Sequence, residues 1–237
     1  AITASQRATE RAMHRAEDVL SDAVVDGDVL VHEDEPLSAE RLRAEIEVSL
    51  LYEGCHAEDV IVACGRRGSD PHWRGEGALR PDEPIVVDVF PRGPEGYYAD
   101  MTRTFVVGEP PEAVAAAHRT TLEAMEAAFD VLDDGAGVTG ETVHDAVCEV
   151  FEAAGHPTTR DDATEGFVHS TGHGVGLDLH EAPRLSESGG ALPAGSVVTV
   201  EPGLYYSDWG GVRVEDLVVV RDDGFENLTE FDVDLVV

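Results

Sequence analysis

Four acidic residues interrupt or flank apolar, β-branched segments, where a carboxylate is unusual. They are Asp88, Asp100, Glu201 and Glu215. A carboxylate in a buried strand is costly unless it is paired with a cation or bound to a metal ion. Arg103 and Arg213 are the obvious partners nearby in sequence, and two arginines are too few for four acids. Metal binding is therefore the first hypothesis for this set, whereas most other acidic residues of the chain are expected on the solvated surface.

A histidine-rich segment adds nitrogen donors. His169, His173 and His180 fall within twelve positions and are interleaved with glycines. A single histidine is more often a packed or surface residue than a ligand, but this density, with glycines that allow close backbone approach, favours function. Four carboxylates and an imidazole suit two divalent ions such as Mn, Co or Zn better than a structural zinc site. Two such ions could activate water and polarise a carbonyl.

The segments that position these residues follow two periodicities. The spacing of apolar residues predicts helices at 5–25, 38–52, 114–132 and 141–153. β-branched runs predict strands at 60–63, 85–90, 101–107, 196–200 and 212–220. Gly54 is expected to end the second helix, and a turn at 91–96 joins two strands into a hairpin. Helices grouped before hairpins indicate an α+β fold, with an antiparallel sheet covered by helices.

The second half of the chain repeats the order of the first. Residues 37–54 match residues 138–155 at a constant offset, apolar position for apolar position, and residues 86–91 resemble 197–202. We therefore expect two helix-helix-hairpin halves related by a pseudo-twofold axis. A chance match between apolar helices is the alternative.

The charge balance excludes several classes of partner. The chain has 49 acidic and 16 basic residues, a formal net charge of -33, and all its basic residues apart from histidine are arginines. Self-repulsion at this level is destabilising unless ions screen it, which indicates adaptation to concentrated salt. Nucleic acid and anionic membranes are poor partners for such a surface. A disordered acidic chain is excluded because 42% of the residues are hydrophobic and fall into periodic segments.

Length, hydropathy and cysteine content indicate the domain number, the location and the redox state of the protein. We expect one domain over residues 1–237, because no linker-like stretch divides them. No apolar run approaches the roughly 18 residues needed to span a bilayer, and a cytoplasmic protein is expected. Cys55, Cys64 and Cys148 form neither an even set nor a CxxC pair, so they are expected to be reduced.

At its acidic and histidine positions the sequence resembles the pita-bread metallopeptidases, which include Xaa-Pro dipeptidase (prolidase), aminopeptidase P, methionine aminopeptidase and creatinase. The resemblance covers nearly the whole chain. The family's order of ligands and flanks is matched at Asp88 and within residues 100–105, 173–176, 200–203 and 212–216. The resemblance implies a pita-bread fold, two metal ions and a peptide substrate.

It also implies a division of the metal ligands. Asp88 would chelate one ion, His173 and Glu201 would hold the other, and Asp100 and Glu215 would bridge the two. The ions implied are Mn or Co, with Zn as a third candidate.

Catalytic and substrate-binding roles follow from the same likeness. A hydroxide held between the ions would attack the scissile carbonyl, and Glu201 would pass a proton towards the leaving nitrogen. His72 and His180 would stabilise the tetrahedral intermediate and orient the peptide. His169 and Arg184 are candidates for substrate or carboxylate binding, with a structural role equally open.

Arg213 and Thr102 would orient the ligand carboxylates from behind. Residues 88–100 are one longer than usual in the family, with Phe90 and Pro91 where many members have a glycine. This should move a loop without losing a ligand. The chain also begins without Met and without the N-terminal domain of prolidases. It is therefore either a fragment or a minimal member, and a homodimer is left open.

The flanks at 100–105 and 211–216 resemble the prolidase and aminopeptidase P branch more than methionine aminopeptidase. Creatinase-like members do not use the metal set. The expected activity is hydrolysis of the Xaa-Pro bond at the N-terminus of dipeptides or longer peptides. The alternatives are a methionine aminopeptidase-like exopeptidase and a catalytically inactive peptide-binding domain of the same fold.

Overall fold

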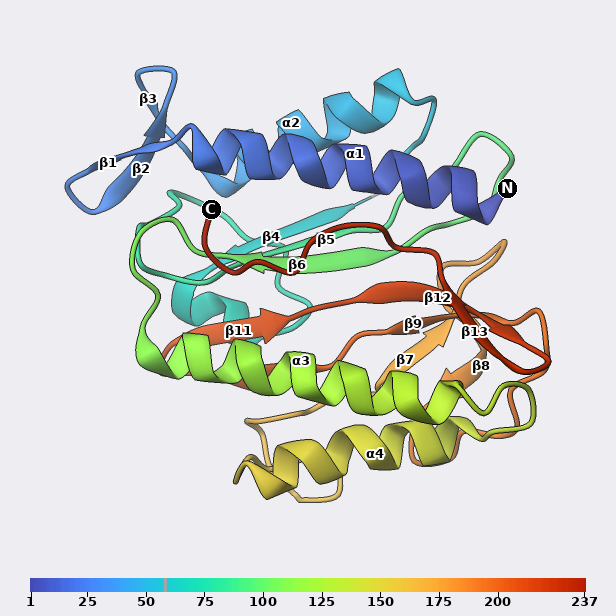
Figure 1. Cartoon of the computed structure of the whole chain (residues 1–237). Coiled ribbons are helices and arrows are strands. Elements are labelled where there is room, and N and C mark those ends of the chain that lie inside the picture. The colour runs from blue at the N-terminus through green and yellow to red at the C-terminus, as the bar shows by residue number, and fades with distance from the viewer. Residues whose placement is uncertain (58) are drawn as a thin grey trace.

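The computed structural model describes residues 1–57 and 59–237, which form two similar halves (Figure 1). The first half contains α1 (Ile2–Ser21), β1 (Val24–Asp26), β2 (Val29–His32), β3 (Glu35–Pro36), α2 (Ala39–Tyr52), β4 (Val60–Cys64), the 3-10 helix η1 (Gly65–Ser69), β5 (Ile85–Val89) and β6 (Met101–Phe105). The second contains α3 (Glu112–Leu132), α4 (Gly140–Ala153), β7 (Gly172–Gly174), β8 (Glu181–Leu185), β9 (Val197–Val200), β10 (Gly203–Tyr206), β11 (Gly210–Arg213), β12 (Asp216–Arg221) and β13 (Gly224–Asn227).

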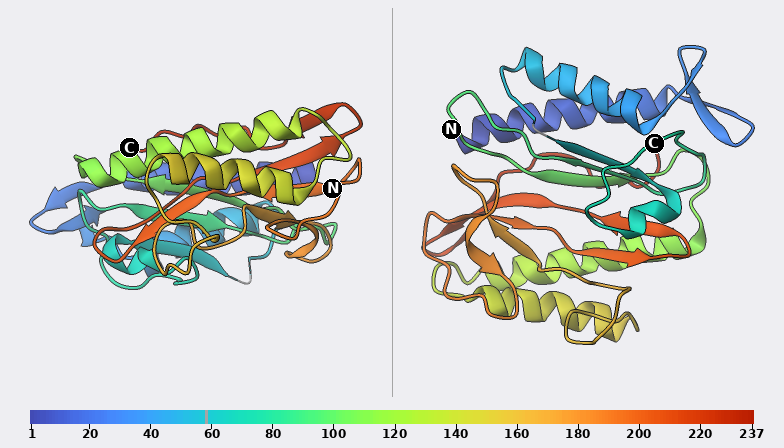
Figure 2. Two further views of the ribbon diagram at one scale, coloured as in Figure 1. Left: turned by 90° about the horizontal axis from the view of Figure 1, so that it is seen from below. Right: turned by 180° about the vertical axis from the view of Figure 1, so that it is seen from behind.

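Each half pairs two helices beside its strands. Helix α1 packs against α2, and α3 packs against α4. In Figure 1 the first pair runs along one side of the strands and the second pair along the other, and the reverse view in Figure 2 shows the same order. The paired strands within the sheets are antiparallel. The prediction of an α+β fold is therefore confirmed.

Equivalent residues begin and end the second helix of each half. The side chain of Ser38 accepts a hydrogen bond from the Arg41 amide at the start of α2, and Thr139 caps α4 in the same way. A side-chain acceptor at this position satisfies one of the free N–H groups of the first turn. Gly54 and Gly155, just past the two helices, have positive φ angles of 71° and 86°. The repeat in the sequence thus corresponds to a repeat of local structure.

Two antiparallel pairs of strands place the acidic residues at the centre of the molecule. β5 and β6 form the predicted hairpin, with Val89 opposite Met101. β9 and β12 are the corresponding pair in the second half, with Val200 opposite Asp216. β4 joins the first pair, and β13, β7 and β8 extend the second.

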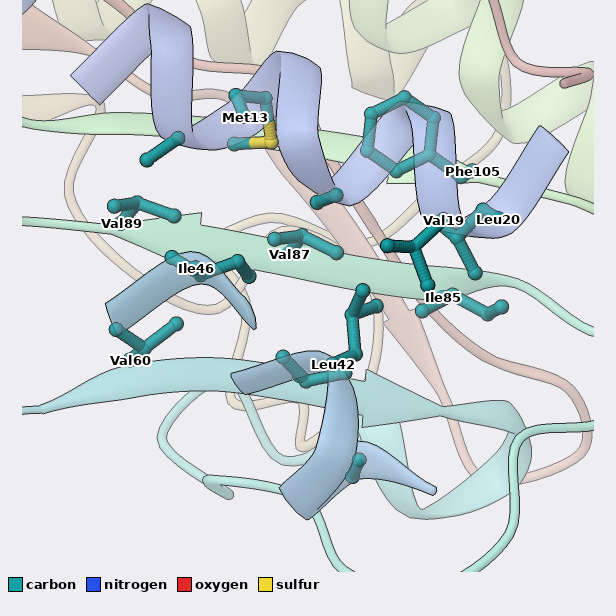
Figure 3. Packing of buried hydrophobic residues seen from close by; sticks show 14 of the residues in the cluster. Met13, Val19, Leu20, Leu42, Ile46, Val60, Ile85, Val87, Val89 and Phe105 are labelled. Atoms are coloured by element: carbon teal, nitrogen blue, oxygen red, sulfur yellow. The ribbon is translucent and has the colours of Figure 1, made fainter. Parts of the chain in front are cut away.

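Each half has its own apolar core. Leu42, Ile46 and Val87 are fully buried where α1 and α2 pack on β4, β5 and β6 (Figure 3). Phe151 and Val198 belong to the core formed by α3, α4 and the second-half strands. Burying one such side chain contributes about 1.5–3 kcal/mol. These two cores fix the strands whose ends carry the acidic residues.

The predicted first helix is too long. It ends at Ser21 rather than at residue 25, because Val24 and Val25 pair with β2 instead. The turn of this hairpin contains Gly27, whose φ of 64° suits a tight connection. In Figure 1 the hairpin projects from the end of α1.

The predicted strand at 212–220 is two strands. β11 ends at Arg213 and pairs with β10, whereas β12 begins at Asp216 and pairs with β9. Glu215 lies in the break between them. Among the helices at 1–57 and 59–237, none is long and apolar enough to cross a membrane.

Candidate metal centre

One cavity of about 310 Å³ collects nearly all the residues singled out in the sequence. Its lining includes Asp88, Asp100, His173, Glu201, Glu215, His72, His169, His180, Arg184 and Arg213. Both halves contribute, since Asp88 and Asp100 come from the first half and His173 from the second. Thr102, which is fully buried, is not in the lining and lies behind Glu215.

The strand registers explain why the carboxylates converge. Asp88 on β5 lies opposite Thr102 on β6, and Asp100 precedes Thr102 by two residues. Side chains two apart in extended chain point to the same face, so both aspartates face the cavity. Glu201 and Glu215 each stand one residue beyond the last pair of β9 and β12. The adjacent ends of β9 and β12 therefore place Glu201 and Glu215 close together at the cavity.

Three of these groups form a compact cluster. Ligand atoms of Asp100, His173 and Glu215 all lie within 4.8 Å of one another, and the three residues are buried. His173 Nε2 is 3.4 Å from Glu201 Oε1 and 3.7 Å from Asp100 Oδ2. His173 Nδ1–H donates to the Gly174 carbonyl, which leaves the Nε2 lone pair of the neutral ring facing the carboxylates. Lone pairs pointed at one another in this way call for a cation between them.

Burial and mutual repulsion hold protons on the acids in the absence of a metal ion. Burial, and then the Glu215 and Asp88 carboxylates, hold the pKa of Asp100 well above its usual range. Burial, followed by Glu201 and Asp88, does the same to the pKa of Glu215. Burial also raises the pKa of Glu201 to about 7, and it lowers the pKa of His173. A divalent cation would reverse these tendencies, because it stabilises the ionised carboxylates.

Asp88 is held differently from the other acids. Its Oδ2 accepts a hydrogen bond of 2.6 Å from Arg213 Nη2. Its Oδ1 is buried and has no partner in the described part of the chain. A buried carboxylate oxygen without a partner is unfavourable and calls for a ligand such as a metal ion.

Arg213 organises the wall behind the carboxylates. Its Nε–H donates to Thr102 Oγ1 at 3.1 Å, and Thr102 in turn donates to Glu215 Oε2 at 2.7 Å. Its Nη1 donates to the Tyr205 hydroxyl at 2.7 Å. One guanidinium thus fixes Asp88 directly and Glu215 through a single hydroxyl.

His169 is engaged by the protein at both ring nitrogens. Its Nδ1 is 2.8 Å from the Ser170 carbonyl, so Nδ1 carries the hydrogen. Its Nε2, 3.0 Å away, therefore accepts from the Tyr205 hydroxyl. Burial, and then the Arg213 charge, lower the pKa of His169 to about 3, which keeps the ring neutral. This geometry leaves neither nitrogen to bind a substrate carboxylate and favours the structural role.

Three other predicted residues stand at the mouth of the cavity. His72, His180 and Arg184 are exposed, and the His180 ring lies 4.2 Å from the ring of His173, centroid to centroid. Burial, and then the neighbouring His173, lower the pKa of His180. Arg184 lies opposite His173 across β7 and β8. No acidic side chain of residues 1–57 and 59–237 forms an ion pair with it.

The sequence interpretation missed two features of the cavity. One is Tyr205, whose hydroxyl links Arg213 to His169 by hydrogen bonds. In the sequence, its only sign is that an aromatic residue follows Glu201 in a strand. The other is an apolar wall that includes Ile61 and Phe90. In the sequence, Ile61 and Phe90 fall in the predicted strands at 60–63 and 85–90, and nothing about them points to a cavity.

Comparisons with known proteins agree with this arrangement. A sequence profile described as metallopeptidase family M24 matches residues 1–222. The "Probable dipeptidase PepE" of Mycobacterium tuberculosis is 36% identical over 198 residues, 82% of this chain and 50% of that protein. The "Xaa-Pro dipeptidase" of Pyrococcus furiosus is 32% identical over 197 residues, 81% of this chain and 54% of that protein. The chain therefore spans about half the length of these relatives.

Solved structures show the same fold. The X-Pro aminopeptidase of Thermotoga maritima matches with a TM-score of 0.84 and 31% identity, over 100% of this chain and 61% of its own. The prolidase from Pyrococcus furiosus matches with a TM-score of 0.83 and 28% identity, over 98% of this chain and 63% of its own.

Proposed function

Because the chain belongs to metallopeptidase family M24 and has its pita-bread fold, we propose that it hydrolyses the peptide bond between an N-terminal residue and a following proline. The observation that carries this proposal is the convergence of four carboxylates and one imidazole on a single cavity. The names of the similar proteins, a dipeptidase, an Xaa-Pro dipeptidase and an X-Pro aminopeptidase, supply the substrate class.

The donor set fits a pair of divalent ions. It consists of hard carboxylate oxygens and one imidazole nitrogen, which suits Mn, Co or Zn. Asp88 with its unpartnered oxygen would hold one ion, and His173 with Glu201 would hold the other. Asp100 and Glu215, whose ligand atoms lie within the compact cluster, would bridge the two. Such ions, when bound, supply Lewis-acid activation of water and of the scissile carbonyl.

The protein's own side chains then handle the proton and the peptide. Glu201, whose Oε1 lies 3.4 Å from His173 Nε2 at the cluster, would take up a proton on its carboxylate and release it to the leaving nitrogen. His180 beside His173 can donate a hydrogen bond to the oxygen that gains negative charge. His72, which is exposed and also lines the cavity, would orient the peptide. Arg213 keeps Asp88 and Glu215 in place during the reaction.

The two ends of the cavity suggest how a dipeptide lies in it. Arg184 is an exposed guanidinium at one rim, and it can bind the C-terminal carboxylate of a short substrate. Ile61 on β4 and Phe90, just beyond β5, form an apolar wall beside Asp88. With the carboxylate at Arg184 and the scissile bond at the acidic cluster, the side chain before the proline faces this wall.

The test is a substrate panel with the purified protein at high salt. Metal is removed, and Mn, Co or Zn is loaded separately. Release of the N-terminal residue is then measured for Ala-Pro, Leu-Pro, Ala-Pro-Ala and Met-Ala-Ser, and release of urea is measured for creatine. We expect turnover of the Xaa-Pro substrates only, and faster turnover of dipeptides if Arg184 binds the carboxylate. Cleavage of Met-Ala-Ser with Xaa-Pro peptides intact would assign the chain to the methionine aminopeptidase branch. Tight metal binding without hydrolysis of any peptide would leave a binding domain.

A further inference from the structure

Arg103 is a buried cation next to the cavity but outside it. It is 1% exposed, and its five N–H groups reach five oxygen acceptors at 2.7–3.0 Å. The acceptors are the carbonyls of Thr102, Glu215, Phe231 and Asp232 and the carboxylate of Asp216. A guanidinium has five N–H donors, so every one of them is used.

Two of these acceptors belong to the wall of the metal centre. Nη1 donates to the Thr102 carbonyl at 2.9 Å and to the Glu215 carbonyl at 2.7 Å. The Glu215 amide also donates to the Thr102 carbonyl, at 3.0 Å, and the Thr102 hydroxyl donates to the Glu215 carboxylate. Arg103 therefore holds the backbone on which a bridging ligand stands, at the break between β11 and β12.

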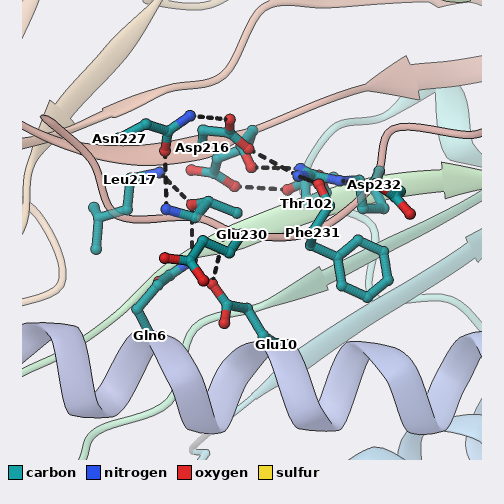
Figure 4. Close-up of polar contacts among 12 residues, drawn as sticks. Gln6, Glu10, Thr102, Asp216, Leu217, Asn227, Glu230, Phe231 and Asp232 are labelled. Atoms are coloured by element: carbon teal, nitrogen blue, oxygen red, sulfur yellow. Dashed lines mark hydrogen bonds and ion pairs between the residues drawn. The ribbon is translucent and has the colours of Figure 1, made fainter.

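The other end of Arg103 holds the C-terminal segment, residues 228–237. Nε donates to the Asp232 carbonyl and Nη2 to the Phe231 carbonyl. The segment is anchored independently through Thr229, whose hydroxyl accepts from the Leu217 amide and from Gln6 Nε2 of α1. Figure 4 shows Gln6 on α1, Leu217 beside Asp216, and Phe231 and Asp232 of the C-terminal segment close by.

We propose that Arg103 is a positioning residue for the metal centre: it locks the main chain of Glu215 against the C-terminal segment, so that the Glu215 carboxylate is aimed before any ion arrives. Losing Arg103 would remove a donor from the buried Glu215 carbonyl and from the carbonyls of Phe231 and Asp232, and would leave the Asp216 carboxylate without its cation. The break at Glu215 has no strand pairing of its own to hold it. The proposal rests on the metal-binding part of the proposed function and does not require that the substrate contains proline.

Lysine cannot substitute for this geometry. It keeps the charge but offers three donors from one point instead of five in a plane. Arg103→Lys should therefore preserve the ion pair with Asp216 while leaving the Glu215 or Phe231 carbonyl without a partner. Asp216→Asn is a milder change at Arg103, since it keeps an oxygen acceptor for Nη2, although it also removes the acceptor of the Asn227 Nδ2–H bond.

The experiment is a Mn²⁺ titration of metal-free protein at molar salt, with free Mn²⁺ followed by its EPR signal, well below the melting temperature of each variant. We expect Arg103→Lys to bind the tighter ion about 10–100-fold more weakly, the range for partners that orient metal ligands. Asp216→Asn should give a smaller loss. Gln6→Ala is the matched control: it loosens the same C-terminal segment, touches neither Arg103 nor a ligand, and should lower thermal stability without changing Mn²⁺ affinity.

Three results would overturn the proposal. Wild-type Mn²⁺ affinity in Arg103→Lys would show that Arg103 has no role in aiming the ligand. An equal loss in Gln6→Ala and Arg103→Lys would show that general loosening of the segment, not the guanidinium, is responsible. Absence of Mn²⁺ binding in the wild-type protein would overturn the proposed metal centre together with this inference, whereas tight binding without peptide hydrolysis would leave the inference standing.

Discussion

At the scale of single residues, the cavity is defined by an excess of negative charge over positive charge. Arg213 is the one arginine in the described ranges that bonds directly to a proposed ligand carboxylate. Its guanidinium donates one hydrogen bond each to Asp88, Thr102 and Tyr205. The remaining acids of the cavity are either protonated or bound to metal ions. The first two predictions concern these two states.

Replacing either proposed bridge by alanine should abolish metal binding at both positions. Asp100→Ala or Glu215→Ala removes a carboxylate shared by two ions, so both lose a ligand at once. Losing a partner that only orients a ligand costs about 10–100-fold in affinity or activity, so losing a bridge should cost at least about 100-fold in kcat/KM. Metal content and peptidase activity are measured together. Glu126→Ala on the exposed face of α3 is the control, and full occupancy in either bridge variant would mean that the site is misassigned.

The metal-free protein should lose stability as the pH rises from about 4.5 to about 7. Burial raises the pKa of Glu201 from an ordinary 4.5 to about 7 in the folded chain. Its contribution is therefore fully present below the unfolded value and is lost as the pH rises through the folded one. This group alone accounts for a change on the order of 3 kcal/mol. Urea denaturation at pH 5 and pH 8 measures it, and Glu201→Gln should reduce the difference, while the raised pKa values of Asp100 and Glu215 maintain the remainder. A metal-free protein equally stable at both pH values would contradict this assignment.

Phe90 should influence which residue is accepted before the proline. Its side chain lines the cavity beside Ile61, one residue beyond the strand that carries Asp88. Small changes of apolar contact alter transition-state binding by about 1–3 kcal/mol, so Phe90→Ala should lower the preference for Leu-Pro over Gly-Pro about tenfold. The ratio of kcat/KM for the two dipeptides is the measurement. An unchanged ratio together with intact metal binding would place the side chain elsewhere in the cavity.

At the scale of elements, the helices were predictable because apolar spacing marks each of them and side-chain caps support α2 and α4. Ser38 and Thr139 stand where the sequence repeat places them, and each caps its helix. Strand pairing was harder to predict, because registers depend on residues distant in the chain. The apolar run at 212–220 reads as one strand, and only its two different partners, β10 and β9, divide it at Glu215.

The metal centre, too, could be predicted only in part from the sequence. The proposed metal ligands could be predicted because carboxylates in apolar strands contradict their surroundings. Tyr205 and Phe90 could not, because aromatic residues in or beside strands are ordinary until the fold shows what they contact. The hairpin at 24–32 did carry a signal, the Asp26-Gly27 turn between apolar residues, and the helical pattern before it hid that signal.

The two equivalent caps give a prediction at this scale. Ser38→Ala and Thr139→Ala each remove one acceptor for a first-turn amide, so each should lower the free energy of unfolding by about 1 kcal/mol. Because the caps lie in different halves, their effects should add, and metal affinity should not change. Urea unfolding of the single and double variants tests this. If the loss of unfolding free energy in the double variant differs strongly from the sum of the two single losses, the two halves are energetically coupled through their helices.

At the scale of the whole molecule, the net charge of -33 dominates. Most of the ion pairs are exposed, with Arg103–Asp216 and Arg213–Asp88 as the buried arginine pairs of the described chain. Exposed pairs contribute about 0–1 kcal/mol each. They cannot offset repulsion among the remaining acids, so stability should depend on dissolved ions.

We therefore expect the melting temperature to fall as salt is removed. The Debye length grows from about 3 Å at 1 M to about 30 Å at 0.01 M, so like charges then repel across the whole surface. Thermal denaturation in KCl at both ends of this range measures the effect, and metal-loaded protein should be partly protected by mass action. Sorbitol at equal osmolality is the control, since it is uncharged and cannot screen the repulsion between acidic groups. A melting temperature independent of salt would argue against halophilic adaptation.

The division of the proposed ligands between two halves has a consequence for the life of the protein in a cell. Asp88 and Asp100 come from one half and His173, Glu201 and Glu215 from the other, so neither half holds a complete centre. A nascent or damaged chain in which only one half has folded would carry no hydrolytic site and could not attack the peptides around it. Activity would thus appear only when assembly is finished, and the enzyme would need no inhibitory propeptide to keep it silent during synthesis.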